Sequence, residues 1–253
     1  MKVQKYIEFF MTKLTVLKSQ KKYHNGKYEL KYIFEDNNSD VLVVIFSACT
    51  RVGIKARYNY HRTLEKFKVN KLFILDDFGF DKRGAYYLGH NSDYEIQNCT
   101  KSLLNEITNK GNYKKVVYVG TSKGAYAALN FGIEKNVDMI IGAPQYYLGD
   151  YLNDEGEKLG TLKYIVGNIN DENIKVLNNL LPNKVRNADD YKGKIYLHYS
   201  TEEHTYEEHI KWLIDDFDKK GIDYEEDVCT YTNHSDVSLH FPNYLVSTLK
   251  SII

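Results

Sequence analysis

One segment, Lys115–Phe131 (KVVYVGTSKGAYAALNF), constrains the fold more than any other part of the chain. An apolar strand pattern, KVVYV, runs directly into a turn bounded by glycines, and a helix pattern rich in small residues follows. The spacing G-x-S-x-G places Ser122 at the tip of the turn, between Gly120 and Gly124. Strand and helix approach closely at such a turn, so small residues are needed on either side of the serine. The segment therefore predicts a strand–turn–helix that exposes a nucleophilic serine.

Strand patterns alternate with helix patterns along most of the chain. Val41–Phe46 (VLVVIF) is continuously apolar, which is typical of a strand buried on both faces. Other strand patterns lie at Lys71–Leu75, Lys115–Val119, Val137–Ile141, Lys194–Tyr199 and Glu226–Tyr231. Helix patterns lie at Ile96–Asn109, Ala125–Phe131, Tyr206–Lys219 and Val237–Ile252. This alternation predicts an α/β fold with a mostly parallel sheet and helices on both faces.

The two ends of the pattern complete the expected architecture. Thr12–Lys18 and Lys27–Phe34 alternate polar and apolar residues, and His24-Asn25-Gly26 between them predicts a hairpin turn. With these two strands the sheet has eight. Residues 145–190 contain no strand pattern, and we expect a small helical lid insertion there. We predict a single α/β-hydrolase domain over residues 1–253, since no linker-like composition divides the chain.

In an α/β-hydrolase the catalytic residues follow the chain order serine, acid, histidine. The acid belongs just beyond the strand that follows the lid, where the sequence reads Thr201-Glu202-Glu203-His204. We favour Glu203, and Glu202 is the alternative. Acidic residues in such a loop are also common as solvated groups that stabilise the start of the next helix.

The histidine of this set belongs in the loop after the last strand, and His234 occupies that loop. Ser235 and Asp236 are good helix N-caps, which leaves His234 outside the helix. His240 falls inside the following helix pattern. In this assignment His234 takes the proton of Ser122, and the acid holds the imidazole in the correct tautomer.

An oxyanion hole is expected beside the serine. The backbone amide of Lys123 lies at the start of the helix after Ser122, where amides are unpaired and the helix dipole is positive. By the logic of the fold, amides of the loop after Val41–Phe46, around Ser47 and Ala48, complete it.

Two motifs for bound groups fail on spacing. The pattern His204-Thr205-Tyr206-Glu207-Glu208-His209 resembles a zinc-protease helix, but its histidines are five residues apart. On a helix they would point about 140° apart, so we predict no metal site. The Lys-Gly pair of GTSKG lacks the spacing of a phosphate-binding P-loop. No cofactor is predicted.

Composition narrows the classes of partner. The 34 Lys and Arg balance the 34 Asp and Glu, and no basic stripe argues for a nucleic acid partner. The lysine-rich first residues do not read as a signal peptide, and no apolar run reaches the about 20 residues of a membrane span. The three cysteines form no CxxC pair, which fits a reducing compartment. We expect a cytoplasmic protein, and the abundance of Lys, Asn, Ile and Tyr suggests an AT-rich bacterial genome.

With these residues assembled, the chain resembles α/β-hydrolase-like proteins of Gram-positive glycan pathways. These are the acetyltransferase-like component of the accessory Sec system and the XcbB/CpsF-type capsular polysaccharide biosynthesis proteins. The likeness covers most of the chain after residue 40. It rests on the segments VLVVIFSACTR, RYNYHRTLEKF, KLFILDDFGFDKRGAYYLG, YVGTSKGAYAALNFGI, IIGAPQYYLGDYL and HSDVSLHFPNYL.

The resemblance implies a serine esterase or O-acyltransferase, with acetyl as the expected acyl group, that acts on carbohydrate through an acyl-enzyme. Ser122, Glu203 and His234 fall where the triad of that family would lie. Whether water or a sugar hydroxyl attacks the acyl-enzyme stays open. Tyr86, Tyr87, Tyr146 and Tyr147 could stack on sugar rings, although packing is the more common role of tyrosine.

The main alternative is a non-catalytic scaffold in a glycan-synthesis or secretion-accessory complex, which would keep the serine turn only for folding. A peptidase of the same fold is a third reading, and no residue distinguishes it. The expected partners are an acyl ester or glycan substrate and a protein of that pathway.

Overall fold

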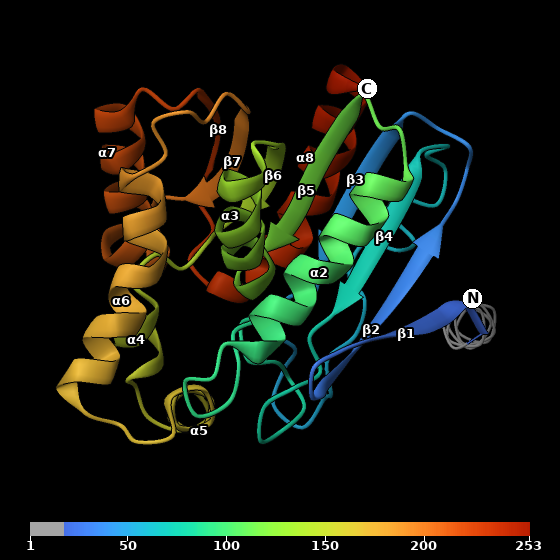
Figure 1. Cartoon of the computed structure of the whole chain (residues 1–253). Helices are drawn as coiled ribbons and strands as arrows, with labels where there is room; N and C mark the ends of the chain where they lie inside the picture. Colours follow the sequence, from blue (N-terminus) through green and yellow to red (C-terminus); the bar gives the residue numbers. More distant parts are fainter. Residues whose placement is uncertain (1–17) are drawn as a thin grey trace, which may run out of the picture.

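The computed structural model describes residues 18–253 and contains an eight-stranded sheet (Figure 1). The strands lie in the order β1-β2-β4-β3-β5-β6-β7-β8. Strands β1–β2 and β2–β4 pair antiparallel, and all other neighbours pair parallel. Their bounds are β1 Gln20–Asn25, β2 Tyr28–Glu35, β3 Val41–Phe46, β4 Asn70–Leu75, β5 Lys115–Thr121, β6 Asp138–Gly142, β7 Ile195–Ser200 and β8 Tyr224–Cys229. The predicted α/β fold class with a mostly parallel sheet is confirmed.

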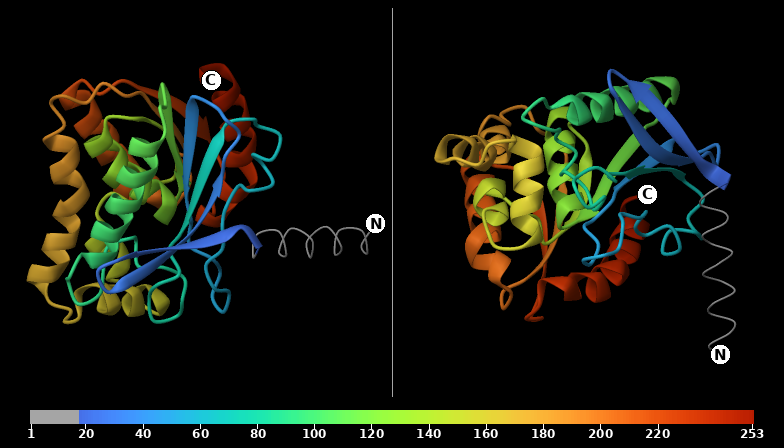
Figure 2. Two further views of the ribbon diagram at one scale, coloured as in Figure 1. Left: turned by 45° about the vertical axis from the view of Figure 1, so that its right-hand side comes forward. Right: turned by 90° about the horizontal axis from the view of Figure 1, so that it is seen from below.

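Helices cover both faces of this sheet, as the two further views show (Figure 2). One face packs against α2, α3, α6 and α7 through a large apolar cluster that includes Leu103, Ala128 and Phe217. The other face packs against α8 through Phe241, Leu245 and neighbours. The helix bounds are α2 Glu95–Lys110, α3 Lys123–Lys135, α4 Leu148–Leu152, α5 Glu157–Val166, α6 Asp171–Arg186, α7 Lys211–Lys220 and α8 Val237–Ile252.

The N-terminal hairpin forms with a different first strand from the one expected. The turn lies at Gly26, whose φ of +64° suits a glycine, and β1 runs up to Asn25. A two-residue turn needs both strands to reach it, so the pairing partner of β2 is Gln20–Asn25. Most of the expected strand Thr12–Lys18 lies outside the described residues, as do the lysine-rich first residues.

Two other expected boundaries are corrected near the C-terminus. The last strand was expected at Glu226–Tyr231, but β8 is Tyr224–Cys229, because its register with β7 pairs Ile195 with Tyr224. The predicted helix Tyr206–Lys219 begins with a π-helical turn, η1 (Tyr206–Ile210), before α7. The turn brings His209 into the interior, where its side chain is 2% exposed.

The stretch 145–190 is helical, as expected, and contains α4, α5 and α6. In Figure 1, α4 and α5 lie at the lower left, and α6 rises along the left side toward α7. Its role as a lid stays a prediction.

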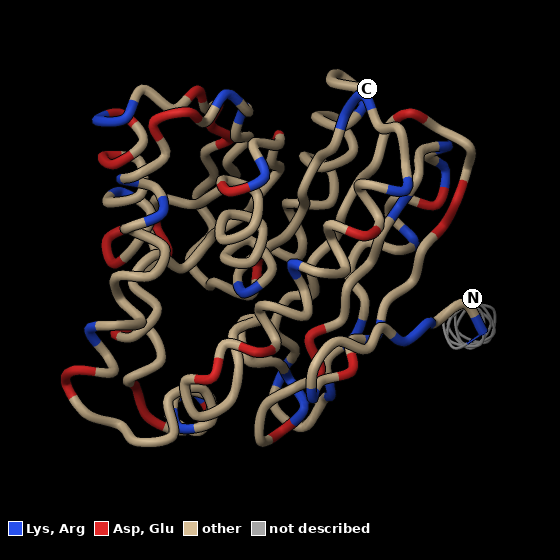
Figure 3. Tube along the Cα trace, viewed as in Figure 1, with Lys and Arg blue, Asp and Glu red and all other residues tan. Residues whose placement is uncertain are grey.

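The surface of the described chain carries both signs of charge, interspersed along the trace (Figure 3). Within residues 18–253, no helix has the length and apolar character needed to cross a bilayer. Cys49, Cys99 and Cys229 are all free thiols. Strand β8 is one of the two edge strands of the sheet, β1 being the other, and its sequence YEEDVC places three acidic residues there.

Candidate active site

The turn between β5 and α3 holds Ser122 in a strained backbone conformation. Ser122 has φ 50° and ψ −121°, which non-glycine residues rarely adopt. A Cβ at Gly120 would lie 2.2 Å from the carbonyl group of Gly124, and one at Gly124 would lie 2.6 Å from the carbonyl oxygen of Phe46. Both positions therefore require glycine, and the predicted reason for the G-x-S-x-G spacing holds in the structure.

Three side chains from three loops form one hydrogen-bonded chain. The Oγ of Ser122 lies 2.9 Å from His234 Nε2, and His234 Nδ1 lies 2.9 Å from Glu203 Oε2. Ser122 follows β5, Glu203 follows β7, and His234 begins the short 3-10 turn after β8. Glu202 is exposed, and His240 lies within α8 with its ring stacked on Tyr231. The structure thus brings together Ser122, Glu203 and His234.

Glu203 is buried but held in its charged form. Burial alone would raise the pKa of its carboxyl group, and the hydrogen bonds from His234 and from the Thr205 hydroxyl lower it by more. The net result is a pKa below the ordinary value. A carboxylate that stays ionised can accept a hydrogen bond from the Nδ1–H of His234 and so leave Nε2 free to accept the proton of Ser122.

Two of the three expected oxyanion donors are engaged elsewhere. The Ser47 amide donates to the Tyr87 hydroxyl at 2.7 Å, and the Ala48 amide donates to Asn59 Oδ1 at 2.9 Å. A buried amide must be paired. Tyr87 reaches Ser47 from the loop after β4, whose path the sequence patterns did not predict. In this arrangement neither amide is free for an oxyanion, which contradicts that part of the prediction. The Lys123 amide is the first of α3 and has no acceptor within its helix.

The Lys123 side chain forms a buried ion pair that sequence reasoning missed. Its Nζ lies 2.9 Å from Asp76 Oδ2, and the two residues are 1% and 0% exposed. Asp76 also accepts the amides of Ala85 and Tyr87, so it joins the loop after β4 to the start of α3. An aspartate directly after the buried strand KLFIL was the available signal, because a buried carboxylate needs a cationic or amide partner.

Gln145 was also not predicted. It follows β6, is 0% exposed, and places its side-chain nitrogen 3.2 Å from Ser122 Oγ and 3.4 Å from His234 Nε2. The Tyr86 hydroxyl donates to Gln145 Oε1 at 3.5 Å. Its position at the carboxyl end of a parallel strand, where active sites of such sheets lie, was the signal in the sequence.

Ser122 and His234 open into a cleft of about 510 Å³. Arg51 and Arg57 line it and are exposed, and their guanidinium groups have no ion pair or hydrogen bond within residues 18–253. Tyr151 and Lys158, from the 145–190 stretch, line it as well.

The four tyrosines considered for sugar stacking mainly pack inside the protein. Tyr86, Tyr87 and Tyr146 are buried, and Tyr147 is half-buried. Tyr86 packs edge-on against Tyr126, and the Tyr146 hydroxyl donates to Asp216.

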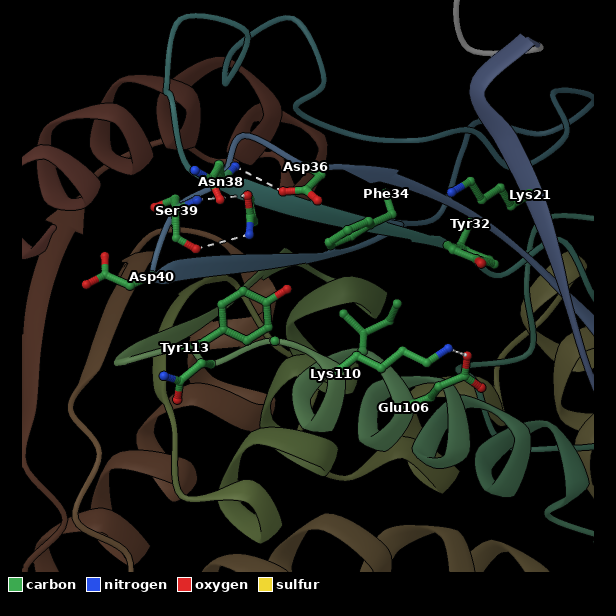
Figure 4. Close-up of a pocket in the computed structure, with 14 residues that line it drawn as sticks. Lys21, Tyr32, Phe34, Asp36, Asn38, Ser39, Asp40, Glu106, Lys110 and Tyr113 are labelled. Carbon is green, nitrogen blue, oxygen red and sulfur yellow. Dashed lines mark hydrogen bonds and ion pairs between the residues drawn. The ribbon is translucent and has the colours of Figure 1, made fainter.

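A second cleft of about 580 Å³ lies away from these residues (Figure 4). It is lined by mostly polar residues of β1, β2, the loop before β3, the start of β4 and the end of α2 with the loop after it. Ser122, His234 and Glu203 do not line it. Many of its groups are paired with one another, for example Lys110 with Glu106 and the Asn38 amide with Asp36.

One group of metal-ligand types occurs among the described residues. Ligand atoms of His198, Asp227 and Cys229 lie within 4.8 Å of one another on β7 and β8. His198 Nδ1 already lies 2.6 Å from Asp227 Oδ2, so a metal would have to separate an existing hydrogen bond. Nδ1 of His204 pairs with Glu208, whereas His209 is buried and its Nδ1 accepts the Tyr147 amide.

Comparison with known proteins finds that this chain is similar to several solved structures. No family model and no curated protein sequence matches the chain. A capsule O-acetyltransferase of Neisseria meningitidis serogroup A is similar to it with a TM-score of 0.77, at 22% identity over 90% of this chain and 93% of that one. A mutant of the same enzyme is described in complex with CoA.

Two other structures extend the likeness. The glycosylation-associated Gap123 complex of Streptococcus agalactiae is similar with a TM-score of 0.74, at 18% identity over 92% of this chain and 46% of that one. The serine hydrolase FphF of Staphylococcus aureus has a TM-score of 0.63, at 11% identity over 91% and 97%. The chain therefore has the α/β-hydrolase fold, and its structural neighbours include a capsule O-acetyltransferase and a glycosylation-associated protein.

Proposed function

We propose that this protein is a serine O-acyltransferase that moves an acetyl group onto a carbohydrate hydroxyl through an acyl-enzyme on Ser122. The observation that carries the proposal is the hydrogen-bonded chain from Ser122 through His234 to Glu203 at the cleft. His234 Nε2 takes the Ser122 proton as Oγ attacks the acyl carbonyl carbon, and the imidazolium returns it to the leaving group. Glu203 stabilises the imidazolium, and the Lys123 amide donates to the oxyanion.

The second half-reaction repeats these steps with the acceptor. A sugar hydroxyl gives its proton to His234 while its oxygen attacks the acetyl carbon, and Ser122 Oγ leaves and recovers the proton. The products are an acetylated sugar and the free serine.

A CoA thioester is the proposed donor, because a structural neighbour with capsule O-acetyltransferase activity is described in complex with CoA. Arg51 and Arg57 support this choice. They present two unpaired guanidinium groups to the cleft of Ser122, and guanidinium groups bind phosphate through paired hydrogen bonds.

The first test is labelling with a fluorophosphonate probe, which reacts only with an activated serine. We expect Ser122→Ala to abolish labelling and His234→Ala to slow it by about 10³-fold or more, because the serine then lacks its base. Ser251→Ala, which changes an exposed serine of α8, is the matched control and should label like wild type.

The second test is release of free thiol from acetyl-CoA with and without capsular polysaccharide acceptors. Acceptor-dependent release that is lost in Ser122→Ala supports transfer. If the folded protein is not labelled and releases no thiol, the proposed enzymatic activity is refuted and the non-catalytic scaffold is favoured.

A further inference from the structure

The carboxylate of Glu203 is held by two side-chain donors, one on each of its oxygens. Oε2 lies 2.9 Å from His234 Nδ1, and Oε1 accepts a hydrogen bond from the Thr205 hydroxyl. Within residues 18–253, no backbone amide and no third side chain donates to this carboxylate. Its orientation therefore depends on Thr205 wherever it does not depend on His234 itself.

The local backbone holds the Thr205 hydroxyl in place. Thr205 directly precedes the π-helical turn η1, with φ −69° and ψ −15°. The amide of Tyr206 donates to the carbonyl oxygen of Glu203 at 3.1 Å, which closes the turn between the two residues. The hydroxyl donor and the carboxylate acceptor thus belong to one short, hydrogen-bonded piece of chain.

A second hydrogen bond fixes what one alone leaves free. The terminal torsion of a glutamate side chain is broad, so a carboxylate held through one oxygen can turn about its last carbon–carbon bond. A donor on the other oxygen sets the plane of the carboxylate. That plane decides whether Oε2 points at His234 Nδ1, and so whether Nε2 faces Ser122.

Burial removes the usual substitute for a missing donor. Glu203 is 2% exposed and Thr205 is 0% exposed, so bulk water does not reach Oε1. Without the hydroxyl, Oε1 would be a buried acceptor with no partner. Such a carboxylate holds a proton more tightly, either on itself or on the imidazole to which it is bonded.

We infer that Thr205 is a positioning residue for the reaction at Ser122, because its hydroxyl fixes the Glu203 carboxylate in the plane that holds the His234 imidazole. The inference rests on the proposed function. Thr205 does not line the cleft, and it contacts neither Ser122 nor His234 through a hydrogen bond. Its proton stays on Oγ1 throughout, while the catalytic proton moves between Ser122 and His234.

Other titratable groups surround Glu203, but none of them can replace the hydroxyl. They are His198 of β7, His204 of the same loop, Tyr151 of α4 and Tyr231 after β8. Among the described residues, none of these four hydrogen-bonds the carboxylate. Their influence acts at a distance, and a substitution at Thr205 leaves all four in the chain.

The experiment measures the rate of fluorophosphonate labelling of Ser122 against pH, in the full chain. Thr205→Val keeps the shape of the side chain and removes the hydroxyl. We expect it to be labelled about tenfold more slowly than wild type at about pH 7. The acid limb of its rate profile should also move to higher pH by about half a unit or more, because the imidazolium persists beside the more basic carboxylate. Thr205→Ser restores the hydroxyl and should recover the wild-type limb.

Thr100→Val is the matched control, because Thr100 is also fully buried and its hydroxyl donates to the Ile96 carbonyl oxygen within α2. It makes the same chemical change away from Glu203, and its profile should coincide with that of wild type. If Thr205→Val does not fold, Thr205→Ala removes the same hydroxyl and is interpreted in the same way.

Three results overturn the inference while wild type is labelled. The first is a Thr205→Val profile that coincides with wild type. The second is slower labelling with an unmoved acid limb, because lost packing then explains the change. The third is a Thr205→Ser or Thr100→Val profile that matches Thr205→Val. Wild type that is not labelled at any pH refutes the proposed function itself, and the inference with it.

Discussion

Two adjacent glutamates illustrate how a single residue's surroundings decide its chemistry. Glu203 is buried and bonded to His234, while Glu202 is exposed one position earlier. The pKa of Glu203 lies below its ordinary value, because its hydrogen bonds outweigh the effect of burial. Its contribution to folding is therefore present above the ordinary carboxyl range and is lost as the pH falls through the lowered pKa.

A substitution at each glutamate separates the alternatives that the sequence left open. Glu203→Gln should lower the rate of fluorophosphonate labelling by about 10²–10⁴-fold, because an amide no longer fixes the His234 tautomer. Glu202→Gln makes the same chemical change at the exposed neighbouring residue. This control should be labelled at the wild-type rate. Equal rates for the two variants would show that Glu203 does not act through His234.

The sequence allowed Ser122 and His234 to be chosen by chain order, because the elbow spacing and the loop after the last strand are local signals. Gln145 and Asp76 had only their position after a strand as a signal, and their partners, which lie in other loops, could not be assigned from it. Ser47 was assigned by analogy within the fold, and the Tyr87 hydroxyl that takes its amide comes from the unpatterned stretch after β4. Residue roles that depend on contacts between loops could not be read from one sequence.

At the scale of elements, the buried pair of Lys123 and Asp76 links α3 to the loop after β4. Gly84 permits this, because a Cβ there would lie 2.0 Å from Lys123 Nζ. The pair thereby joins the lysine of GTSKG to the first aspartate of the DDFGFDKRGAYYLG block.

Breaking the pair should destabilise the fold strongly. Asp76→Asn leaves the Lys123 ammonium buried without a counter-charge, and we expect the free energy of unfolding to fall by about 3–5 kcal/mol. Urea unfolding measures the loss. Glu106→Gln, which breaks the exposed pair with Lys110 on α2, should leave the midpoint unchanged. Equal losses of unfolding free energy in the two variants would contradict the expectation that burial makes the Lys123–Asp76 pair matter more than the exposed pair.

Element types were predicted well from the sequence, and their ends less well. Val41–Phe46 is recovered as β3 because a fully buried parallel strand leaves an unbroken apolar run. Strand β8 was displaced by two residues at each end, because an edge strand with acidic side chains has no apolar pattern to mark its register. The π-helical turn before α7 depends on the burial of His209, which local propensity does not report.

The stability of the whole molecule is coupled to pH through buried histidines. Burial lowers the pKa of His209 from 6.5 to about 4, and it also lowers the pKa of His198. Between these values the unfolded chain binds a proton at His209 that the folded chain does not. Stability is therefore complete above the unfolded pKa and falls as the pH drops toward the folded one.

For His209 alone the loss should reach about 2 kcal/mol on going from about pH 7 to about pH 5. His209→Asn offers an oxygen that can accept the Tyr147 amide as Nδ1 does, and it cannot take up a proton. Its unfolding free energy should therefore change less steeply with pH. His24→Asn, at an exposed position of β1, should keep the wild-type slope. Parallel pH profiles for all three proteins would exclude His209 as the source.

The β8 edge of the sheet has a consequence for how copies of the protein meet. A free strand offers unpaired backbone groups to any other free strand, and two molecules could in principle continue one sheet across β8. Glu225, Glu226 and Asp227 would then face the same three residues of the second copy. Repulsion between these carboxylates would oppose such pairing. Such a safeguard weakens in acid or concentrated salt, so those are the conditions under which intermolecular sheets would first form.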